Sequence, residues 1–238
     1  MSIINSLCHK EVALASLHEK ERADLIKKLV EFTQQYYRID DPQCFIERVL
    51  QPDTNGTLVI YSIADTWVGY TRSYQQTLMT SKKEYTVFSS SVWYNPNLQL
   101  DAATARFALL HTLRYRLFKP HESLAYFVIA SSPQRYNYLK KLNPDCESCP
   151  NGTARMEITE LITAMAQQNN WEQDIDNPFI IHQKFPALTH LQHSTDTASD
   201  FIKLNPKYKE GDWLMVYVPL DLQTISKSIK LSVREAVT

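Results

Sequence analysis

The fold of this chain is decided at residues 84–142, EYTVFSSSVWYNPNLQLDAATARFALLHTLRYRLFKPHESLAYFVIASSPQRYNYLKKL. Its pattern predicts a strand at 84–94, a loop at 95–101, a helix at 102–118, a strand at 124–130 and the start of a second helix at 132–142. This order favours a parallel pair of strands with the first helix packed across it. The loop that enters that helix is where such a unit commonly binds a ligand.

The flanking residues extend this unit into one larger sheet. Upstream, periodicity predicts a strand at 11–17, a helix from a Ser16–Glu19 capping box to about Tyr37, a helix at 43–50, and strands at 57–63 and 67–79 that form a meander with 84–94. Gly69 suggests a bulge in the second of these strands. Downstream, we expect a helix at 154–170 and strands at 178–185 and 213–220.

The fold class is therefore α/β, in the α+β sense. We predict a mixed, mostly antiparallel central sheet with helices on both faces, in the order β-α-α-β-β-β-α-β-α-β-β with an inserted helix. Residues 1–238 form a single domain in this interpretation. Residues 143–177 are an insertion that carries the extra helix, and 221–238 are a C-terminal tail.

Composition limits the class of partner. The chain has 238 residues and a net charge of −1, so nothing indicates a nucleic-acid or membrane-surface partner. No apolar run reaches the ~20 residues that a membrane-spanning helix needs. The N-terminus lacks the pattern of a signal peptide, so we expect a cytoplasmic protein.

With these elements in order, the chain resembles the GNAT superfamily of acyl-CoA N-acyltransferases. The resemblance covers about 11–142, and also 178–220 if 143–177 is an insertion. In that family a Pro, then Arg or Gln, then glycines form the turn that binds pyrophosphate. Here Pro96 and Gln99 fit, but Ala102 and Thr104 replace glycines. The resemblance implies a degenerate pyrophosphate loop and an acyl-CoA co-substrate, acetyl-CoA or longer, bound at Val92, Trp93, Tyr94, Gln99, Leu100, Ala102, Ala103, Thr104 and Ser132.

Asp101 leaves two interpretations of this loop open. Free N–H groups at a helix N-terminus carry partial positive charge and hydrogen-bond a pyrophosphate. Asp101 stands at the N-cap position, where its carboxylate can satisfy those N–H groups and repel a phosphate. The loop is thus either a working coenzyme A site or a structural cap. Candidates for compensating positive charge, or for a merely solvated helix face, are Arg106, Arg114, Arg116 and Lys119.

Four residues are candidates for catalysis. The family carries a tyrosine in the helix after the 124–130 strand, which protonates the departing thiolate. Tyr138 lies closest to that position, and Tyr136 is its neighbour. A phenol suits this role because its reference pKa of about 10 approaches that of a thiol. Glu84 is the best-placed carboxylate for a general base, with His111 as a further candidate; packing is the alternative role for each.

The resemblance implies direct transfer of an acetyl or longer acyl group to an amine on a small molecule or a protein, and it is compatible with a homodimer. One alternative is a catalytically inactive GNAT-like protein that binds a partner, acyl-CoA or an acyl carrier. Another is an unrelated α/β protein with the same element order.

The sequence also offers half of a zinc site. Cys146 and Cys149 have the spacing of one ligand pair, and His190 and His193 could complete it. Two loop thiols are the simpler interpretation, so we expect no metal.

Overall fold

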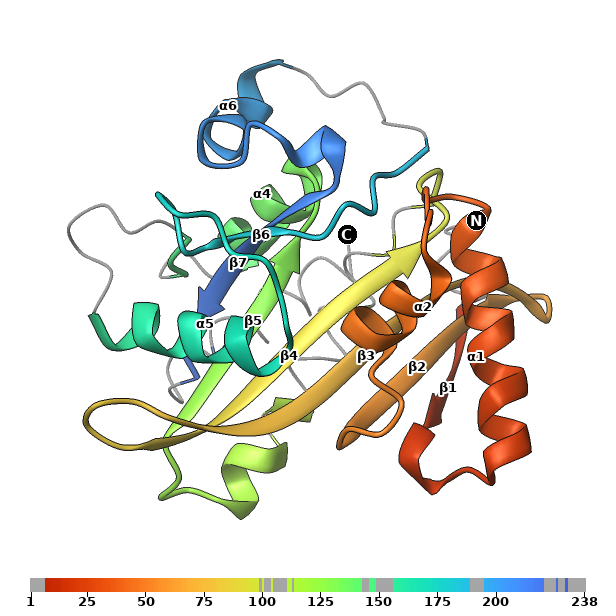
Figure 1. The fold of residues 1–238 in the computed structure, drawn as a ribbon, viewed down its shortest axis with the longest axis horizontal. Coiled ribbons are helices and arrows are strands. Elements are labelled where there is room, and N and C mark those ends of the chain that lie inside the picture. Colours follow the sequence, from red (N-terminus) through yellow and green to blue (C-terminus); the bar gives the residue numbers. More distant parts are fainter. Residues whose placement is uncertain are drawn as a thin grey trace.

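The computed structural model describes residues 7–98, 100, 104, 111–112, 114–142, 146–148, 156–188, 195–220, 226 and 230 (Figure 1). The strands are β1 (Leu7–Val12), β2 (Gly56–Ile63), β3 (Thr66–Met79), β4 (Glu84–Tyr94), β5 (Leu124–Ala130), β6 (Ile180–His182) and β7 (Asp212–Val218). The longer helices are α1 (Glu19–Gln34), α4 (Pro133–Leu142), α5 (Met156–Gln168) and α6 (Thr195–Leu204). Shorter helical segments are η2 (Leu14–Ser16), α2 (Pro42–Phe45), η3 (Ile46–Leu50) and η4 (Tyr208–Glu210).

One seven-stranded sheet organises these elements, in the order β1-β2-β3-β4-β5-β7-β6. The β4–β5 pair is parallel, and the other paired neighbours are antiparallel. The mixed, mostly antiparallel sheet and the three-strand meander β2-β3-β4 confirm the fold class expected from the sequence. Within the described ranges, no helix is both long and apolar enough to cross a membrane.

Helices cover both faces of the sheet. Side chains at Phe88 and Trp93 point to opposite faces because they differ by an odd number of positions along β4. Phe88 packs on Tyr115, with ring centroids 4.8 Å apart. Residues 114–118 are helical, as predicted for that part of the chain. Trp93 packs on Phe45 of α2, with ring centroids 5.1 Å apart.

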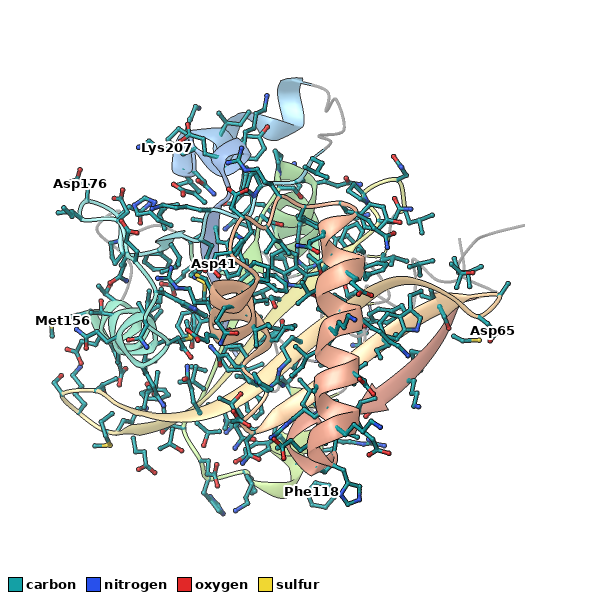
Figure 2. The ribbon with its side chains drawn as sticks, turned by 45° about the vertical axis from the view of Figure 1, so that its right-hand side comes forward. Asp41, Asp65, Phe118, Met156, Asp176 and Lys207 are labelled. Atoms are coloured by element: carbon teal, nitrogen blue, oxygen red, sulfur yellow. The ribbon has the colours of Figure 1, made fainter. Side chains whose placement is uncertain are left out.

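Helix α2 is placed by a local cap. Asp41 precedes it, and the Asp41 carboxylate accepts a hydrogen bond from the backbone N–H of Cys44 at 3.0 Å (Figure 2). Pro42 occupies the first helical position, where its missing N–H costs nothing. The short helix therefore begins at a fixed point, which sets Phe45 against Trp93.

Several element boundaries differ from the sequence prediction. The first strand is Leu7–Val12 rather than 11–17, and its neighbouring residues 14–16 form a helical turn. Strand β6 spans only three residues, Ile180–His182. Helix α6 was not predicted. The described apolar residues that pack inward from its last turn are Phe201 and Leu204, too few to stand out in the sequence.

Gly69 marks a bulge, as the sequence suggested. The β2–β3 register shifts at Tyr61/Ser62, opposite Gly69 and Trp67. A Cβ atom at Gly69 would lie 2.6 Å from the Cβ of Tyr94 and 2.9 Å from the carbonyl oxygen of Trp93. The absence of a side chain here allows β3 to approach the end of β4 closely.

Strands β4 and β5 separate at their carboxyl ends. Their pairing runs from Thr86↔Leu124 to Ser90↔Val128 and stops there. Strand β4 nevertheless continues beside β3 as far as the Gly69↔Tyr94 pair. Figure 1 shows the arrowheads of β4 and β5 pointing apart. The result is a V-shaped opening between two adjacent parallel strands.

Candidate active site

A pocket occupies this opening. One wall is the end of β4, Ser91–Tyr94, and another is the region from the end of β5 to the start of α4, including Ile129, Ser132 and Gln134. The segments 185–187 and 211–213 contribute further walls. Four residues predicted to bind the co-substrate therefore meet in one place: Val92, Trp93, Tyr94 and Ser132.

The end of β4 offers backbone hydrogen-bonding groups to this pocket. Beyond Ser90, no ladder pair with β5 exists among the described residues. Alternate N–H and C=O groups of Ser91–Tyr94 on that edge are therefore not used by the sheet. Such groups can bind an extended amide-containing ligand, or stabilise an oxyanion that develops on a bound carbonyl.

Aromatic side chains hold this edge of the pocket rigidly. The Trp93 ring is only 3% exposed. Its centroid lies 4.8 Å from that of Tyr37 and 5.8 Å from that of Trp213. The Trp93 Nε1–H donates to the Ser91 hydroxyl at 3.2 Å. The pocket-facing end of β4 is therefore fixed from several directions.

The two candidate tyrosines lie on different faces of α4. Gln134 lines the pocket, and Tyr138 follows it at the i+4 position, so both lie on one helix face. Tyr138 is half-buried. Tyr136 is buried on another face, with its hydroxyl 3.1 Å from that of Ser148 and its ring 5.6 Å from Phe201. Neither tyrosine is among the residues that line the pocket, but Tyr138 shares the helix face of Gln134, which does.

The start of α4 follows the sequence prediction closely. The Ser132 hydroxyl accepts a hydrogen bond from the backbone N–H of Arg135 at 3.3 Å, and Pro133 is the first helical residue. A Ser cap with Pro at the first helical position is a favourable helix start, and it agrees with the helix predicted at 132–142.

The carboxylate predicted as general base is not at the pocket. Glu84 is exposed at the opposite end of β4 and pairs with Met79. At 3.3 Å per residue, Glu84 lies about 23 Å from Ser91 along the strand. His111 packs its ring against Phe88 at 6.0 Å, and burial is the main cause that lowers the pKa of its imidazole. Neither side chain is brought to the Ser91–Tyr94 edge.

The predicted pyrophosphate loop is described only in part. Gln99, Asp101, Ala102, Ala103 and Arg106 lie outside the described residues, so the two interpretations of this loop stay predictions.

Two residues of that loop are described, and both are buried. Leu100 is 3% exposed and packs with Val59, Tyr61 and Val68. Thr104 is 1% exposed and donates its backbone N–H to the carbonyl of Leu100 at 3.0 Å. Neither is among the residues that line the pocket.

A positive charge that sequence reasoning missed lies beside Thr104. The Arg135 guanidinium donates through Nη1 to the Thr104 hydroxyl at 3.4 Å and through Nε to the Ile129 carbonyl at 3.1 Å. Arg135 is 5% exposed. It reaches this loop from α4, a helix that is distant in sequence, and only the tertiary structure shows the proximity.

The basic residues proposed earlier lie elsewhere. Arg114, Arg116 and Lys119 are not among the residues that line the pocket. Arg116 donates to the carbonyl of Glu122 at 2.8 Å, and Lys119 pairs with the Glu122 carboxylate at 3.3 Å. Arg116 and Lys119 are therefore engaged with Glu122.

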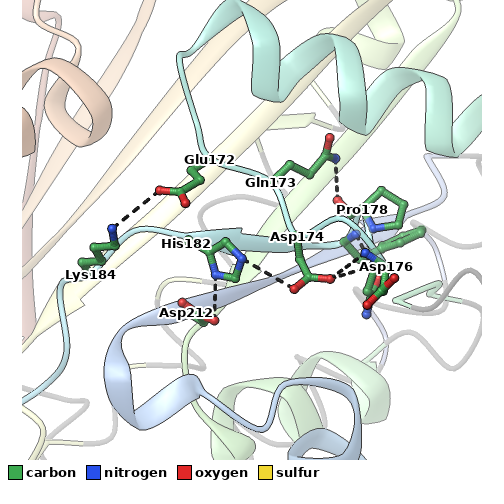
Figure 3. A network of polar contacts seen from close by, with 10 residues as sticks. Glu172, Gln173, Asp174, Asp176, Pro178, His182, Lys184 and Asp212 are labelled. Atoms are coloured by element: carbon green, nitrogen blue, oxygen red, sulfur yellow. Dashed lines mark hydrogen bonds and ion pairs between the residues drawn. The ribbon is translucent and has the colours of Figure 1, made fainter.

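A buried carboxylate lines the pocket, and a histidine contacts this carboxylate (Figure 3). Asp212 lines the pocket, and its side chain is 8% exposed. The His182 Nδ1 lies 2.9 Å from Asp212 Oδ2, and His182 Nε2 lies 3.5 Å from Asp174 Oδ2. Asp212 does not stand out in the sequence. The adjacent β6 pairing His182↔Asp212, which creates the contact, is not visible in the sequence.

Gly211 positions this segment against the opposite wall. Its φ is +104°, in the left-handed region that favours glycine. An added Cβ would lie 2.5 Å from the backbone nitrogen of Phe185 and 2.9 Å from that of Pro186. Gly211 therefore allows Asp212 and the 185–187 segment to line the same pocket.

Metal ligands are not grouped in the described part of the chain. No cluster of three or more His, Cys, Asp or Glu residues there has the geometry to hold a metal ion, and this includes the Asp174–His182–Asp212 trio. Cys146 is buried. Cys149, His190 and His193 lie outside the described residues, so the zinc-site hypothesis stays untested.

Comparisons by sequence found no match to a protein-family model or to a curated protein. Solved structures do resemble it. One is a protein of unknown function from Enterococcus faecalis, a probable N-acyltransferase, with 11% identity and a TM-score of 0.40 over 60% of this chain. The match covers 33% of that protein, so the chain spans about a third of its length.

Two other solved structures are similar over most of their own length. The aminoglycoside acetyltransferase meta-AAC0020, from an uncultured soil metagenomic sample, has 18% identity and a TM-score of 0.34 over 58% of this chain and 86% of that one. The N-acetyltransferase PseH of Campylobacter jejuni has 12% identity and a TM-score of 0.29 over 91% of this chain and 99% of that one. These are distant likenesses. The observed element order, the mixed sheet and the separated β4–β5 pair themselves make the fold GNAT-like.

Proposed function

We propose that the protein is an acyl-CoA-dependent N-acyltransferase that transfers an acetyl or longer acyl group directly to an amine. The observation that carries this proposal is the pocket between β4 and β5, where the sheet pairing stops at Ser90↔Val128 while β4 continues to Tyr94. An opening between two parallel strands, with an unpaired backbone edge, suits a long and narrow amide-bearing chain such as pantetheine.

The end of β4 would bind the co-substrate in this proposal. Backbone N–H groups of Ser91–Tyr94 would hydrogen-bond the pantetheine amides and the thioester oxygen. That oxygen gains negative charge when the amine attacks, so fixed N–H donors there stabilise the transition state more than the ground state. Ser132 and Gln134, at the start of α4, line the other side of the pocket.

The pyrophosphate would lie near the start of the helical segment that contains Thr104. Gln99, Leu100, Ala102 and Ala103 are the other residues of this loop proposed to contribute. The Arg135 guanidinium beside Thr104 supports the proposal, because it supplies a fixed positive charge where the glycines of the family are missing.

The transfer step forms one bond and breaks one. The free amine attacks the thioester carbon, the C–N bond forms, and the C–S bond breaks. The amine gives up a proton to a base, and the departing thiolate takes a proton from Tyr138. Tyr138 is preferred to Tyr136 because it shares a helix face with Gln134, which lines the pocket, whereas Tyr136 is buried on another face. Glu84 lies too far from the pocket to accept the proton of the amine directly.

Calorimetric titration with acetyl-CoA tests this proposal. We expect binding with a dissociation constant of micromolar order. Val92→Trp, which places a large ring in the pocket, should abolish the heat of binding. Thr77→Trp is the matched control, since Thr77 is exposed on β3 and does not line the pocket. Absence of heat with acetyl-CoA and with longer acyl-CoA esters, for a folded protein, would overturn the proposal.

A further inference from the structure

The described lining of the pocket carries a single charged group, which is a carboxylate. Among the described residues that line it, Asp212 is the one charged side chain. It is 8% exposed, so its charge is held largely away from bulk water, where electrostatic interactions with a ligand are stronger. A site with one buried negative charge and no lining cation selects for one positive charge.

The orientation of this carboxylate is fixed from behind. Asp212 Oδ2 is held at 2.9 Å by His182 Nδ1, and the backbone carbonyl of Asp212 accepts a hydrogen bond from Asn205 Nδ2 at 2.9 Å. Asp212 Oδ1 has no hydrogen bond to any residue that the structure describes. One oxygen is therefore committed to the protein, while the other is available to a ligand.

The nearest ionisable partner of Asp212 is His182, which lies between the Asp212 and Asp174 carboxylates, so a protonated imidazole would still leave the three groups with one net negative charge. The two nearest lysines do not neutralise the site. Lys184 follows His182 by two positions, but it is exposed and pairs with Glu172 at 3.6 Å. Lys209 is exposed and lies over the Tyr208 ring at 5.9 Å. Figure 3 shows Lys184 directed toward Glu172 and away from Asp212.

Aromatic rings make up much of the remaining surface. Those that line the pocket are Tyr37, Trp93, Tyr94, Phe185, Tyr208 and Trp213. The faces of such rings attract cations and also bury apolar groups well. Several rings with one carboxylate are the combination that binds an organic ammonium ion.

We propose that Asp212 binds the ammonium group of the acceptor, and that the acceptor is a monocationic amine carried on an apolar or aromatic body. The inference rests on the proposed function and names its substrate class. A polyamine or polycationic sugar would bring charges for which this pocket has no further carboxylate. An anionic acceptor would be repelled by Asp212.

Binding of three small probes in the absence of acyl-CoA tests the inference. Phenethylamine carries one positive charge on an aromatic body, 2-phenylethanol has the same body without the charge, and spermidine carries several charges without the ring. We expect phenethylamine to bind the wild-type protein about tenfold more tightly than 2-phenylethanol, as a charge-assisted hydrogen bond predicts, and spermidine to bind more weakly than phenethylamine. This comparison needs no variant.

A pair of variants locates the effect. Asp212→Asn should remove the preference for phenethylamine over 2-phenylethanol. Asp176→Asn is the matched control, because it removes one negative charge from an exposed residue whose backbone N–H donates to Asp174 Oδ1 at 3.0 Å, outside the pocket. Figure 2 places Asp176 at the periphery of the molecule. Asp176→Asn should keep the wild-type preference.

The outcomes separate this inference from the proposed function. If Asp212→Asn binds phenethylamine as the wild type does, or if spermidine binds more tightly than phenethylamine, the inference is overturned, whatever the acetyl-CoA titration shows. If the preference depends on Asp212 but acyl-CoA esters give no heat, the ammonium site stands and the transferase proposal falls. Thermal unfolding of both variants verifies that they are folded.

Discussion

At the scale of single residues, the two tyrosines of α4 have different environments although they are two positions apart. Tyr136 is 5% exposed and its hydroxyl lies 3.1 Å from that of Ser148. Tyr138 is half-buried and lies one turn beyond Gln134. A general acid must reach the leaving group, so the half-buried position on the Gln134 face suits the role better than the buried one.

We therefore expect Tyr138→Phe to lower kcat about 100-fold or more, the typical contribution of a positioned general acid, with the affinity for acetyl-CoA unchanged. Tyr136→Phe should leave kcat near the wild-type value and lower the free energy of unfolding by about 1 kcal/mol, because it removes one buried hydrogen bond. A steady-state assay of coenzyme A release and urea denaturation measure the two effects. Equal kcat in both variants would mean that Tyr138 is not the acid.

The carboxylates show where prediction from the sequence reaches its limit. Glu84 begins the strand that ends at the predicted site, but a strand places its two ends far apart, and Glu84 is at the wrong end. The sequence does not single out Asp212, because its environment at the pocket depends on the pairing of β6 with β7, which joins His182 to a residue 30 positions away.

At the scale of elements, the sequence predicts the position of a helix or strand correctly wherever its hydrophobic periodicity is strong. The meander and the β5, α4 and α5 elements all lie close to their predicted positions. Periodicity failed for short or weakly apolar elements. Strand β1 is displaced by four residues from 11–17 because most of its residues are exposed and carry no alternation. Helix α6 has few described inward-facing apolar residues.

The central strands carry tyrosines that make the fold sensitive to high pH. Tyr61 of β2, Tyr70 of β3 and Tyr126 of β5 are all buried. Burial raises the pKa of Tyr61 from 10.0 to about 12, and it raises the pKa of Tyr70 and of Tyr126 as well. A raised pKa means that the folded state favours the neutral phenol.

The sign of the pH dependence follows from these shifts. The unfolded chain loses the phenol protons near pH 10, and the folded protein retains them, so the contribution of Tyr61 is full below pH 10 and is lost as the pH rises through about 12. We expect the free energy of unfolding to fall across this window, and buried tyrosines to ionise only as the protein unfolds. Tyrosinate absorbance and circular dichroism, followed together, measure this. Titration of all 13 tyrosines as one class in a folded protein would contradict the expectation.

At the scale of the whole molecule, the pocket is assembled from segments that are far apart in the chain. The backbone N–H of Arg38 donates to the carbonyl of Pro186 at 2.9 Å, and Tyr37 forms a bridge with Ala187. These contacts bring the end of α1 to the 185–187 segment. The GNAT-like element order could be predicted from the sequence, but these long-range contacts could not, because they follow from packing rather than from periodicity.

A crystal structure of the protein with acetyl-CoA tests the proposed use of this pocket most directly. We predict that the pantetheine lies between the ends of β4 and β5, with hydrogen bonds to the backbone of Ser91–Tyr94, that the pyrophosphate lies by Thr104 and Arg135, and that the thioester lies on the Tyr138 side of α4. Acetyl-CoA bound at another surface, or a β4–β5 pocket that stays empty at saturating acetyl-CoA, would contradict the proposal.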